Sequence, residues 1–539
     1  MQERFNKLRG GYYTPQEITN FIAEWAIKDK DVKVLEPSCG DGHFIKSIVE
    51  RLASLGADKS EIQKCLLGIE LYKTEAQKAE QYGTKIVCGD FFGTYRDTIK
   101  GKRKFDVIVG NPPFIRYQNF DEKYRKCAFS LLEEVGIHLT KLSNIWLPFL
   151  ILCCEALNEK NGRLGMVIPA ELFQVDYASE TRKYLSEKFE HLQIITFKKL
   201  LFEGTQQEVV LLLGECKSVE KGIEVFELED ASELMMDFFE QKHTEVKTLD
   251  HTVDKWTKYY LSNDEIELLR KLELHQGLVT TTQLFEVNVG VVSGQNKFFI
   301  IDNKTVVSNS LEKSMIPIIG RAEQLSGIIL NENDLKRLKE NNRKIFMFTP
   351  SGENLNSHEM EYIKKGEKED YHKGYKCRIR KKWYIVPQSW KPEAFLLRQI
   401  GKYPKMVLNL TDATNTDTLH KVRFLDGING KVVSSAFLNS YTFALSEITG
   451  RSYGGGVMTF EPGEIRKLKI PMQKAEQLDI TYIDGLIREN NIEEVLNYTD
   501  KILLMDGLGL TAEEILILRN IWKKLSDRRL YRKGIKGGI

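Results

Sequence analysis

Four consecutive residues, Asn111-Pro112-Pro113-Phe114, have the functional groups needed to hold an aromatic amine. They come directly after the apolar run 105–110. The side-chain oxygen of Asn111 and the carbonyl of Pro112 are neutral acceptors, and proline holds φ fixed and has no N–H group. Rigid acceptors can draw an amine nitrogen toward tetrahedral geometry and align it with an electrophile. Taken alone, the tetrapeptide would be interpreted as a turn that leaves a strand. Its position directly after the apolar run favours a site that holds an aromatic amine, with the ring of that amine stacked on Phe114.

A glycine turn, Glu36-Pro-Ser-Cys-Gly-Asp-Gly42, comes earlier in the chain and suggests a ligand site. Its glycines allow a tight turn and a close approach of backbone to ligand. The turn is not G-x-G-x-x-G, which argues against a dinucleotide. Glu70 and Asp90 end the next two apolar segments and could accept hydrogen bonds from ribose hydroxyls and an adenine amine, with Phe91 or Phe92 against the ring. Singly, each acid reads as a loop residue or a helix cap; together they predict an adenosine-containing cofactor without phosphates.

Thr14-Pro15 predicts the start of a helix, with Thr14 at the N-cap and Pro15 in the first turn. The free N–H groups at such a terminus can receive a carboxylate. An example of such a carboxylate is the one at the amino-acid end of S-adenosylmethionine. We therefore expect this segment to lie close to the cofactor.

The elements that must position these residues alternate between short apolar segments and helical stretches. Strands spaced by helices indicate an α/β fold with a mostly parallel, doubly wound, Rossmann-like sheet, in which ligands bind beyond the carboxyl ends of the strands. The apolar stretch 145–157 is too short to cross a membrane and predicts a buried helix. Seven strands are expected, at 33–36, 66–70, 85–90, 105–110, 163–168, 193–197 and 209–213.

The length of 539 residues implies two or three domains. We expect a catalytic domain over 1–245, a connector, a mixed β-rich domain over 263–470 and a C-terminal helical segment over 471–539 that packs on or extends it. The net charge is only +2, so the chain as a whole is no obvious polyanion binder. Eight cysteines without a C-x-x-C pair suit neither a zinc site nor a disulfide framework, and no metal is expected. A reduced, cytoplasmic setting follows, and the N-terminus has no apolar signal core.

Several stretches together resemble the amino-group DNA methyltransferases, and among them the N6-adenine enzymes of the gamma arrangement, which are TaqI-like. In that arrangement cofactor motifs precede the catalytic motif, and a target recognition domain follows. Order and spacing agree over about the first 245 residues. The matching stretches are GYYTP (11–15), LEPSCGDGHF (35–44), GIEL (68–71), CGDFF (88–92), DVIVGNPPF (106–114), GRLGMVIPAELF (162–173) and LLFEGTQQEVVLLL (200–213).

The resemblance implies roles for these residues. Asn111, Pro112, Pro113 and Phe114 would act on an extruded adenine, and Phe202 would stack on it as a second aromatic. The family more often has Tyr at the fourth catalytic position, so Phe114 keeps the stacking face and loses a hydroxyl. The implied cofactor is S-adenosylmethionine, bound by Tyr13, Thr14, Glu36, Pro37, Ser38, Gly40, Gly42, Glu70, Leu71, Asp90, Phe91 and Asn111.

The C-terminal half resembles the recognition domain of TaqI-type enzymes in three blocks, 291–299, 378–384 and 450–456. Between 371 and 405 there are ten Lys and Arg residues and one acid, Glu393, with tryptophan and tyrosine interleaved. Such a strip favours phosphate binding. The basic tail from Trp522 onward remains undecided between DNA contact and a solvated face. The residues expected to contact DNA are Lys297, Arg378, Arg380, Lys381, Lys382, Trp383, Tyr384, Arg451 and Tyr453.

The sequence thus predicts a site-specific adenine methyltransferase acting on double-stranded DNA, either beside a separate restriction endonuclease or alone as an epigenetic enzyme. We expect a cytoplasmic monomer. Ten residues before GYYTP leave no room for an N-terminal nuclease domain. The alternatives are a protein-glutamine or RNA-adenine methyltransferase, and a non-catalytic DNA specificity subunit. N4-cytosine methylation is disfavoured because that group usually begins the tetrapeptide with Ser.

Overall fold

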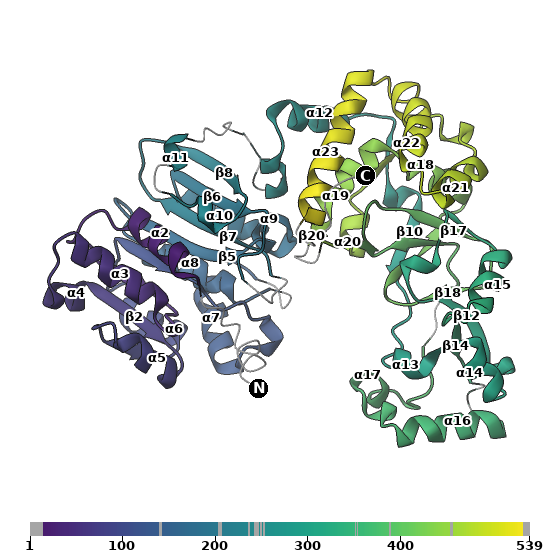
Figure 1. The fold of residues 1–539 in the computed structure, drawn as a ribbon, viewed down its shortest axis with the longest axis horizontal. Helices are drawn as coiled ribbons and strands as arrows, with labels where there is room; N and C mark the ends of the chain where they lie inside the picture. Colours follow the sequence, from purple (N-terminus) through teal and green to yellow (C-terminus); the bar gives the residue numbers. More distant parts are fainter. Residues whose placement is uncertain are drawn as a thin grey trace. The chain divides into compact units, whose positions relative to one another are not determined.

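The structure is a computed structural model. It describes residues 14–139, 143–202, 207–235, 238–241, 247, 249, 251, 254–350, 352, 354–387, 390–452 and 456–531. The chain divides into two compact units (Figure 1). The first comprises Met1–Asn263, Tyr453–Gly456 and Leu530–Ile539, and the second comprises Asp264–Ser452 and Val457–Arg529. Among the described residues, no helix is both long and apolar enough to cross a membrane.

A large sheet forms the centre of the first unit, with the strand order β3-β2-β1-β4-β5-β7-β6-β8. Neighbouring strands are parallel, except that β7 is antiparallel to β5 and β6. The predicted α/β class with a mostly parallel sheet is confirmed. The strands are β1 Val34–Glu36, β2 Leu66–Glu70, β3 Ile86–Cys88, β4 Val107–Gly110, β5 Arg163–Pro169, β6 His191–Phe197, β7 Val209–Glu215 and β8 Gly222–Leu228.

Strand β8 was not among the seven strands predicted from the sequence. Within the described part of the chain it lies at the edge of the sheet beside β6, and most of its residues are half-buried. Its polar positions, such as Glu224 and Glu227, interrupt the apolar run by which the other strands were found. An edge strand with one solvated face has this composition.

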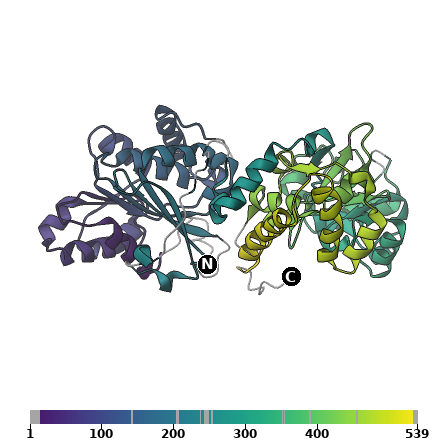
Figure 2. The same ribbon diagram turned by 90° about the horizontal axis from the view of Figure 1, so that it is seen from above.

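Helices lie on both faces of this sheet (Figure 2). Strand β4 is buried throughout, and Val107 and Val109 belong to the core on the side of α2 and α3. The predicted buried helix is confirmed as α8, in which every residue but Glu155 is buried. The helices are α2 Gln16–Ala26, α3 His43–Ser54, α4 Lys59–Cys65, α5 Lys73–Glu80, α6 Phe91–Thr94, α7 Glu122–Glu134, α8 Trp146–Ala156, α9 Glu171–Gln174, α10 Ser179–Lys188 and α11 Phe238–Gln241.

The second unit is built from small sheets. Its largest has the order β10-β19-β15-β17-β13, and a second has the order β11-β14-β12-β18. The predicted β-rich texture is confirmed. The strands are β9 Leu278–Thr280, β10 Phe285–Val289, β11 Ile300–Ile301, β12 Met315–Ile319, β13 Ile329–Leu330, β14 Phe346–Phe348, β15 Ala394–Leu397, β16 Gln399–Ile400, β17 Met406–Asn409, β18 Thr414–Asn415, β19 Leu419–Phe424, β20 Arg451–Ser452, β21 Met458–Thr459 and β22 Lys469–Pro471.

Helices connect these strands, and the C-terminal part is helical, as predicted. They are α12 Asn263–Glu273, α13 Asn296–Phe299, α14 Asn303–Ser308, α15 Glu332–Glu340, α16 Ser357–Lys368, α17 Tyr375–Arg378, α18 Gly430–Ala436, α19 Ser440–Thr449, α20 Pro462–Ile465, α21 Ile480–Arg488, α22 Ile492–Asp500 and α23 Ala512–Tyr531.

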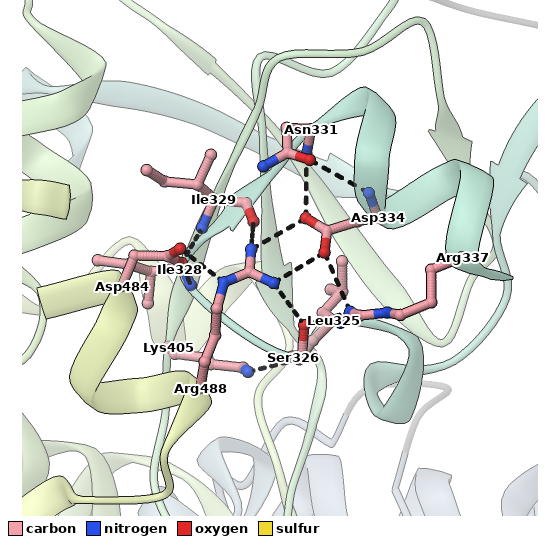
Figure 3. Close-up of polar contacts among 10 residues, drawn as sticks. All are labelled: Leu325, Ser326, Ile328, Ile329, Asn331, Asp334, Arg337, Lys405, Asp484 and Arg488. Carbon is pink, nitrogen blue, oxygen red and sulfur yellow. Dashed lines mark hydrogen bonds and ion pairs between the residues drawn. The ribbon is translucent and has the colours of Figure 1, made fainter.

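A polar cluster around Arg488 fixes α21 to the β-rich part of the second unit (Figure 3). Arg488 donates hydrogen bonds to both carboxylate oxygens of Asp334 at 2.7 and 2.9 Å, and to Asp484 at 2.7 Å. Asp484 in turn accepts from the backbone N–H groups of Ile328 and Ile329 at 2.7 and 2.9 Å. One guanidinium thus joins α21, α15 and the start of β13.

Candidate active site

The candidate site lies where the strand order of the first unit reverses, between β1 and β4. From β1 the chain continues outward through β2 and β3, whereas β4 and β5 lie on the other side. Crevices open at the carboxyl ends of parallel strands at such a point. A cavity of about 550 Å³ is found there, and its lining includes Ser38 after β1, Leu71 after β2, Asp90 after β3 and Asn111 after β4. This volume is ordinary for a small-molecule site.

Glu70, the last residue of β2, is held rigidly at the cavity. Its two carboxylate oxygens accept hydrogen bonds from the backbone N–H groups of Gly40 at 2.9 Å and Tyr72 at 2.8 Å. The carboxyl is buried, and burial raises its pKa. Each carboxylate oxygen has a second lone pair, so Glu70 can still accept hydrogen bonds from hydroxyl groups of a ligand.

Asp90 has two roles at the end of β3. One of its oxygens accepts from the N–H of Gly93 at 2.7 Å and thereby caps α6, while the residue also lines the cavity. Burial raises the pKa of this carboxyl. Phe91 lines the cavity and stacks on Phe149 with ring centroids 4.8 Å apart. Phe92 is fully buried and is not among the lining residues, so Phe91 is the ring next to a ligand.

The glycine turn lies close against its surroundings. Gly42 has φ of +96°, and a Cβ there would come within 2.7 Å of the Cα of Ala79. Glu36 is fully buried, with a pKa raised by burial and by the carboxylate of Glu70. A Cβ at Gly110 would come within 2.7 Å of Glu36 Oε1. The side chain of Glu36, at the end of β1, therefore lies against Gly110 of β4, whereas Pro37, Ser38 and Gly40 line the cavity.

Thr14 is not the helix cap that the sequence predicted. Helix α2 begins at Gln16, and Pro15 is its N-cap, with a carbonyl that accepts from the N–H groups of Ile18 and Thr19. The hydroxyl of Thr14 is engaged elsewhere, because it accepts a hydrogen bond from the amide nitrogen of Asn111 at 3.1 Å. This bond fixes the amide of Asn111 with its oxygen as the accepting atom.

The rest of the tetrapeptide surrounds this amide. Pro113 lines the cavity together with Asn111, and Pro112 is buried. Phe114 is half-buried and Phe202 is buried, and both belong to the hydrophobic cluster on the α2 and α3 side of the sheet. The predicted stacking pair thus packs with one cluster, and neither of its two rings lines the cofactor cavity. Tyr13, predicted to bind the cofactor, lies outside the described residues.

Several lining residues were not named from the sequence. They come from the first turn of α3, from α5, from α8 and from the segment after the tetrapeptide, which only tertiary packing brings together. The close spacing of Phe120, Asp121 and Tyr124 was the one available signal in the last of these. These lining residues include His43, Phe44, Glu75, Ile115, Asn119, Phe120, Asp121, Tyr124 and Phe149.

The cavity is electrostatically one-sided. Among the described lining residues there is no Lys or Arg, whereas five carboxylates are present. Burial raises the pKa of Asp41, Glu70 and Asp90, because removal from water disfavours the charged form of a carboxyl. Such a cavity fits a ligand that carries positive charge together with hydroxyl and amine donors. The five carboxylates are Asp41, Glu70, Glu75, Asp90 and Asp121.

The predicted DNA-contacting residues of the second unit differ in their surroundings. Lys297, Arg378 and Lys381 are exposed. Arg380 is half-buried and donates to the carbonyl of Val292 at 2.9 Å. Lys382, Trp383 and Tyr384 are also half-buried.

Arg451 and parts of the run 371–405, which are predicted to contact DNA, also have partners within the protein. Arg451 is held by the fully buried Glu464, to which it donates hydrogen bonds at 2.6 and 2.8 Å. The run 371–405 is not one exposed strip, because Lys405 is half-buried and donates to the carbonyl of Leu325 at 2.7 Å (Figure 3). Arg398 likewise pairs with Glu461. Tyr453 lies outside the described residues.

Comparison with known proteins gives two family matches. The model described as Eco57I restriction-modification methylase matches residues 49–202, and the C-terminal domain model of type II methyltransferase M.Eco57I matches residues 253–504. The type II methyltransferase M.AccI of Acinetobacter calcoaceticus is 23% identical and aligns over 96% of this chain and 93% of its own length. M.XamI of Xanthomonas campestris pv. amaranthicola is 21% identical over 86% of this chain and 85% of its own length.

Two solved structures share the fold over most of the chain. The type IIL restriction-modification enzyme MmeI in complex with DNA has a TM-score of 0.59 at 12% identity, covering 95% of this chain and 75% of that one. The DrdV–DNA complex has a TM-score of 0.53 at 13% identity, covering 90% of this chain and 57% of that one.

Proposed function

Because the chain is an Eco57I-like member of the type II restriction–modification methyltransferases, we propose that it methylates the N6 amine of adenine in double-stranded DNA. Its cofactor is S-adenosylmethionine. The observation that carries the proposal is the hydrogen bond from Asn111 to Thr14. It holds a neutral acceptor at the edge of a negatively charged cavity, which is the arrangement that methylation of an aromatic amine requires.

The residues of the cavity fit the cofactor. S-adenosylmethionine supplies an electrophilic methyl group on a positively charged sulfonium sulfur. Glu70 would accept hydrogen bonds from the ribose hydroxyls, and Asp90 would accept one from the adenine amine, with Phe91 against the ring. Thr14 and the turn from Pro37 to Gly40 would hold the methionine part. The excess of carboxylates favours a cation at this place.

The target base would be held by the tetrapeptide. Asn111 Oδ1 and the carbonyl of Pro112 would accept the two amine hydrogens and direct the nitrogen lone pair toward the cofactor. Extruding the base from the duplex costs roughly a few kcal/mol. Stacking on Phe114 and Phe202 would offset part of this cost. Neither aromatic ring is among the residues that line the cofactor cavity.

The choice of DNA is supported by the relatives rather than by the cavity. A similar tetrapeptide would also suit a glutamine amide or an RNA adenine. The curated relatives are type II methyltransferases, and MmeI and DrdV were solved with DNA. The proposal further includes a monomer in the cytoplasm, acting alone or beside a separate endonuclease.

Product analysis tests this function. The full-length protein is incubated with methyl-labelled S-adenosylmethionine in three separate reactions. These contain duplex DNA, RNA or a protein extract. The DNA is then digested and its nucleosides are separated by mass. We expect the label in N6-methyldeoxyadenosine. Label in N4-methyldeoxycytidine, or only in the RNA or protein arm, would overturn the proposal.

A further inference from the structure

The segment 375–387 of the second unit has one side fixed in a hydrophobic core. Cys377 in α17 is fully buried. The ring of Trp383 packs against Phe298 with centroids 4.8 Å apart, and its Nε1–H donates to Glu367 at 3.1 Å. The backbone of this segment is therefore held in place, as a surface that recognises a partner requires.

A neighbouring loop extends the same surface. Arg380 donates a hydrogen bond to the carbonyl of Val292 at 2.9 Å, and its guanidinium lies 5.9 Å from the ring of Phe299. A Cβ at Gly294 would come within 2.7 Å of the Cβ of Lys376. The loop around Val292 and helix α17 therefore lie directly against each other.

The outward side of this surface is apolar at its centre. Ile379 is 59% exposed and Val292 is 42% exposed. Both line an open groove of about 720 Å³, together with Ile385 and Pro387. Single exposed apolar side chains are common, but a contiguous group with a polar rim marks an interaction site.

The rim of the groove is cationic. Lys376, Arg380, Lys381 and Lys382 line it, and the described lining residues include no Asp or Glu. Arg378, the last residue of α17, is exposed. The occupant should therefore present a dense row of anions beside apolar surface. Duplex DNA does so, because phosphates flank base edges and thymine methyl groups.

Resting on the proposed function, we propose that Ile379, with Val292 beside it, makes an apolar contact with the bases of the DNA target. Lys376, Arg378 and Lys381 contact the flanking phosphates. The two sets have different tasks, because phosphate contacts position a protein on DNA whereas base contacts specify the sequence. Ile379 is thus a specificity-determining residue, which a count of basic residues would not reveal.

Selection from a library of randomised duplex DNA tests this assignment with the full-length protein. We expect Ile379→Ser to lower the enrichment of the preferred base at one or more positions by about tenfold. Its affinity for bulk DNA, and the salt dependence of that affinity, should stay as in wild type. The matched control is Val307→Ser, since Val307 in α14 of the same unit is an apolar residue with a similar exposure of 57%.

A charge variant separates the two tasks. Arg378→Gln with Lys381→Gln should weaken binding to all sequences, and the slope of log affinity against log salt should fall by about 0.9 for each lost phosphate contact. The assignment is overturned if Ile379→Ser enriches the same motif as wild type, or if wild type enriches none. If wild type enriches a motif that Ile379→Ser loses, yet methylates no DNA, only the proposed function fails.

Discussion

At the scale of single residues, the hydrogen bond between Thr14 and Asn111 determines which atom of the amide can accept a substrate amine. Thr14→Val keeps the shape of the side chain and removes the acceptor for the amide nitrogen. We expect the single-turnover rate of methyl transfer to fall about tenfold, since the half-buried amide of Asn111 loses this partner and its orientation. Thr14→Ser keeps the hydroxyl and should stay near wild type. Equal rates for the valine and serine variants would show that this bond does not orient Asn111.

The buried carboxylates of the cavity make cofactor binding depend on pH. Burial raises the pKa of Glu70 and Asp90, so the folded, cofactor-free protein takes up protons at higher pH than exposed carboxylates do. Protonation removes the charges that attract a cation. We therefore predict that the affinity for S-adenosylmethionine, measured by calorimetry, falls as the pH drops from neutral through these raised pKa values. An affinity that stays constant down to the ordinary carboxylate range would contradict this account.

At the scale of elements, the glycine turn sets the distance between the start of α3 and helix α5. Gly42→Ala adds a methyl group at a φ of +96° and within 2.7 Å of Ala79 Cα. Gly56 has a similar φ of +92°, but a Cβ added there would meet nothing within 4 Å. Gly56→Ala is therefore a control for backbone strain alone, which costs about 1–2 kcal/mol. We expect Gly42→Ala to lower the free energy of unfolding by about 1–3 kcal/mol more than Gly56→Ala does.

Hydrogen exchange of the amides in α3 and α5 is the suitable measurement, since it reports on these helices without requiring two-state unfolding of the whole chain. Cofactor affinity should fall for Gly42→Ala and stay unchanged for Gly56→Ala. Equal effects of the two variants on exchange would mean that the turn has room for a side chain.

The Arg488 cluster makes a second prediction at this scale. Arg488→Met would leave the carboxylates of Asp334 and Asp484 without their main cationic partner, at a cost of about 3 kcal/mol. Arg337→Met is the control, because Arg337 also pairs with Asp334 but has a side chain that is 53% exposed, and exposed pairs contribute less than about 1 kcal/mol. Exchange of the amides in α21 and α15 measures the difference. Equal protection in both variants would contradict an anchoring role.

The sequence predicted most of the elements around the site, for a physical reason. Strands β1, β2 and β4 are short apolar runs that end in an acid or a glycine, and that composition can be read locally. The role of Thr14 was misjudged, because the partner of its hydroxyl, Asn111, is 97 residues away in sequence. The wall formed by Phe120, Tyr124 and Phe149 was missed for the same reason, since local patterns do not show which segments meet at a cavity.

At the scale of the whole molecule, a net charge of +2 conceals two opposite local fields. The first unit carries a cavity lined by carboxylates, and the second carries a groove lined by Lys and Arg. Such fields would attract a cationic cofactor to the first and a polyanionic substrate to the second. The domain limits predicted at 245 and 470 remain predictions, although the chain does divide into two compact units.

The central claim is that the amide of Asn111 activates an adenine amine in DNA for methylation. Single-turnover transfer to duplex DNA at saturating cofactor, compared between wild type and Asn111→Ala, tests it most directly. Calorimetry with S-adenosylmethionine and a circular dichroism spectrum control for cofactor binding and folding of the variant. We predict label at adenine N6 with wild type and a rate at least about 100-fold lower with Asn111→Ala. A folded, cofactor-binding variant that labels adenine as fast as wild type would contradict the account.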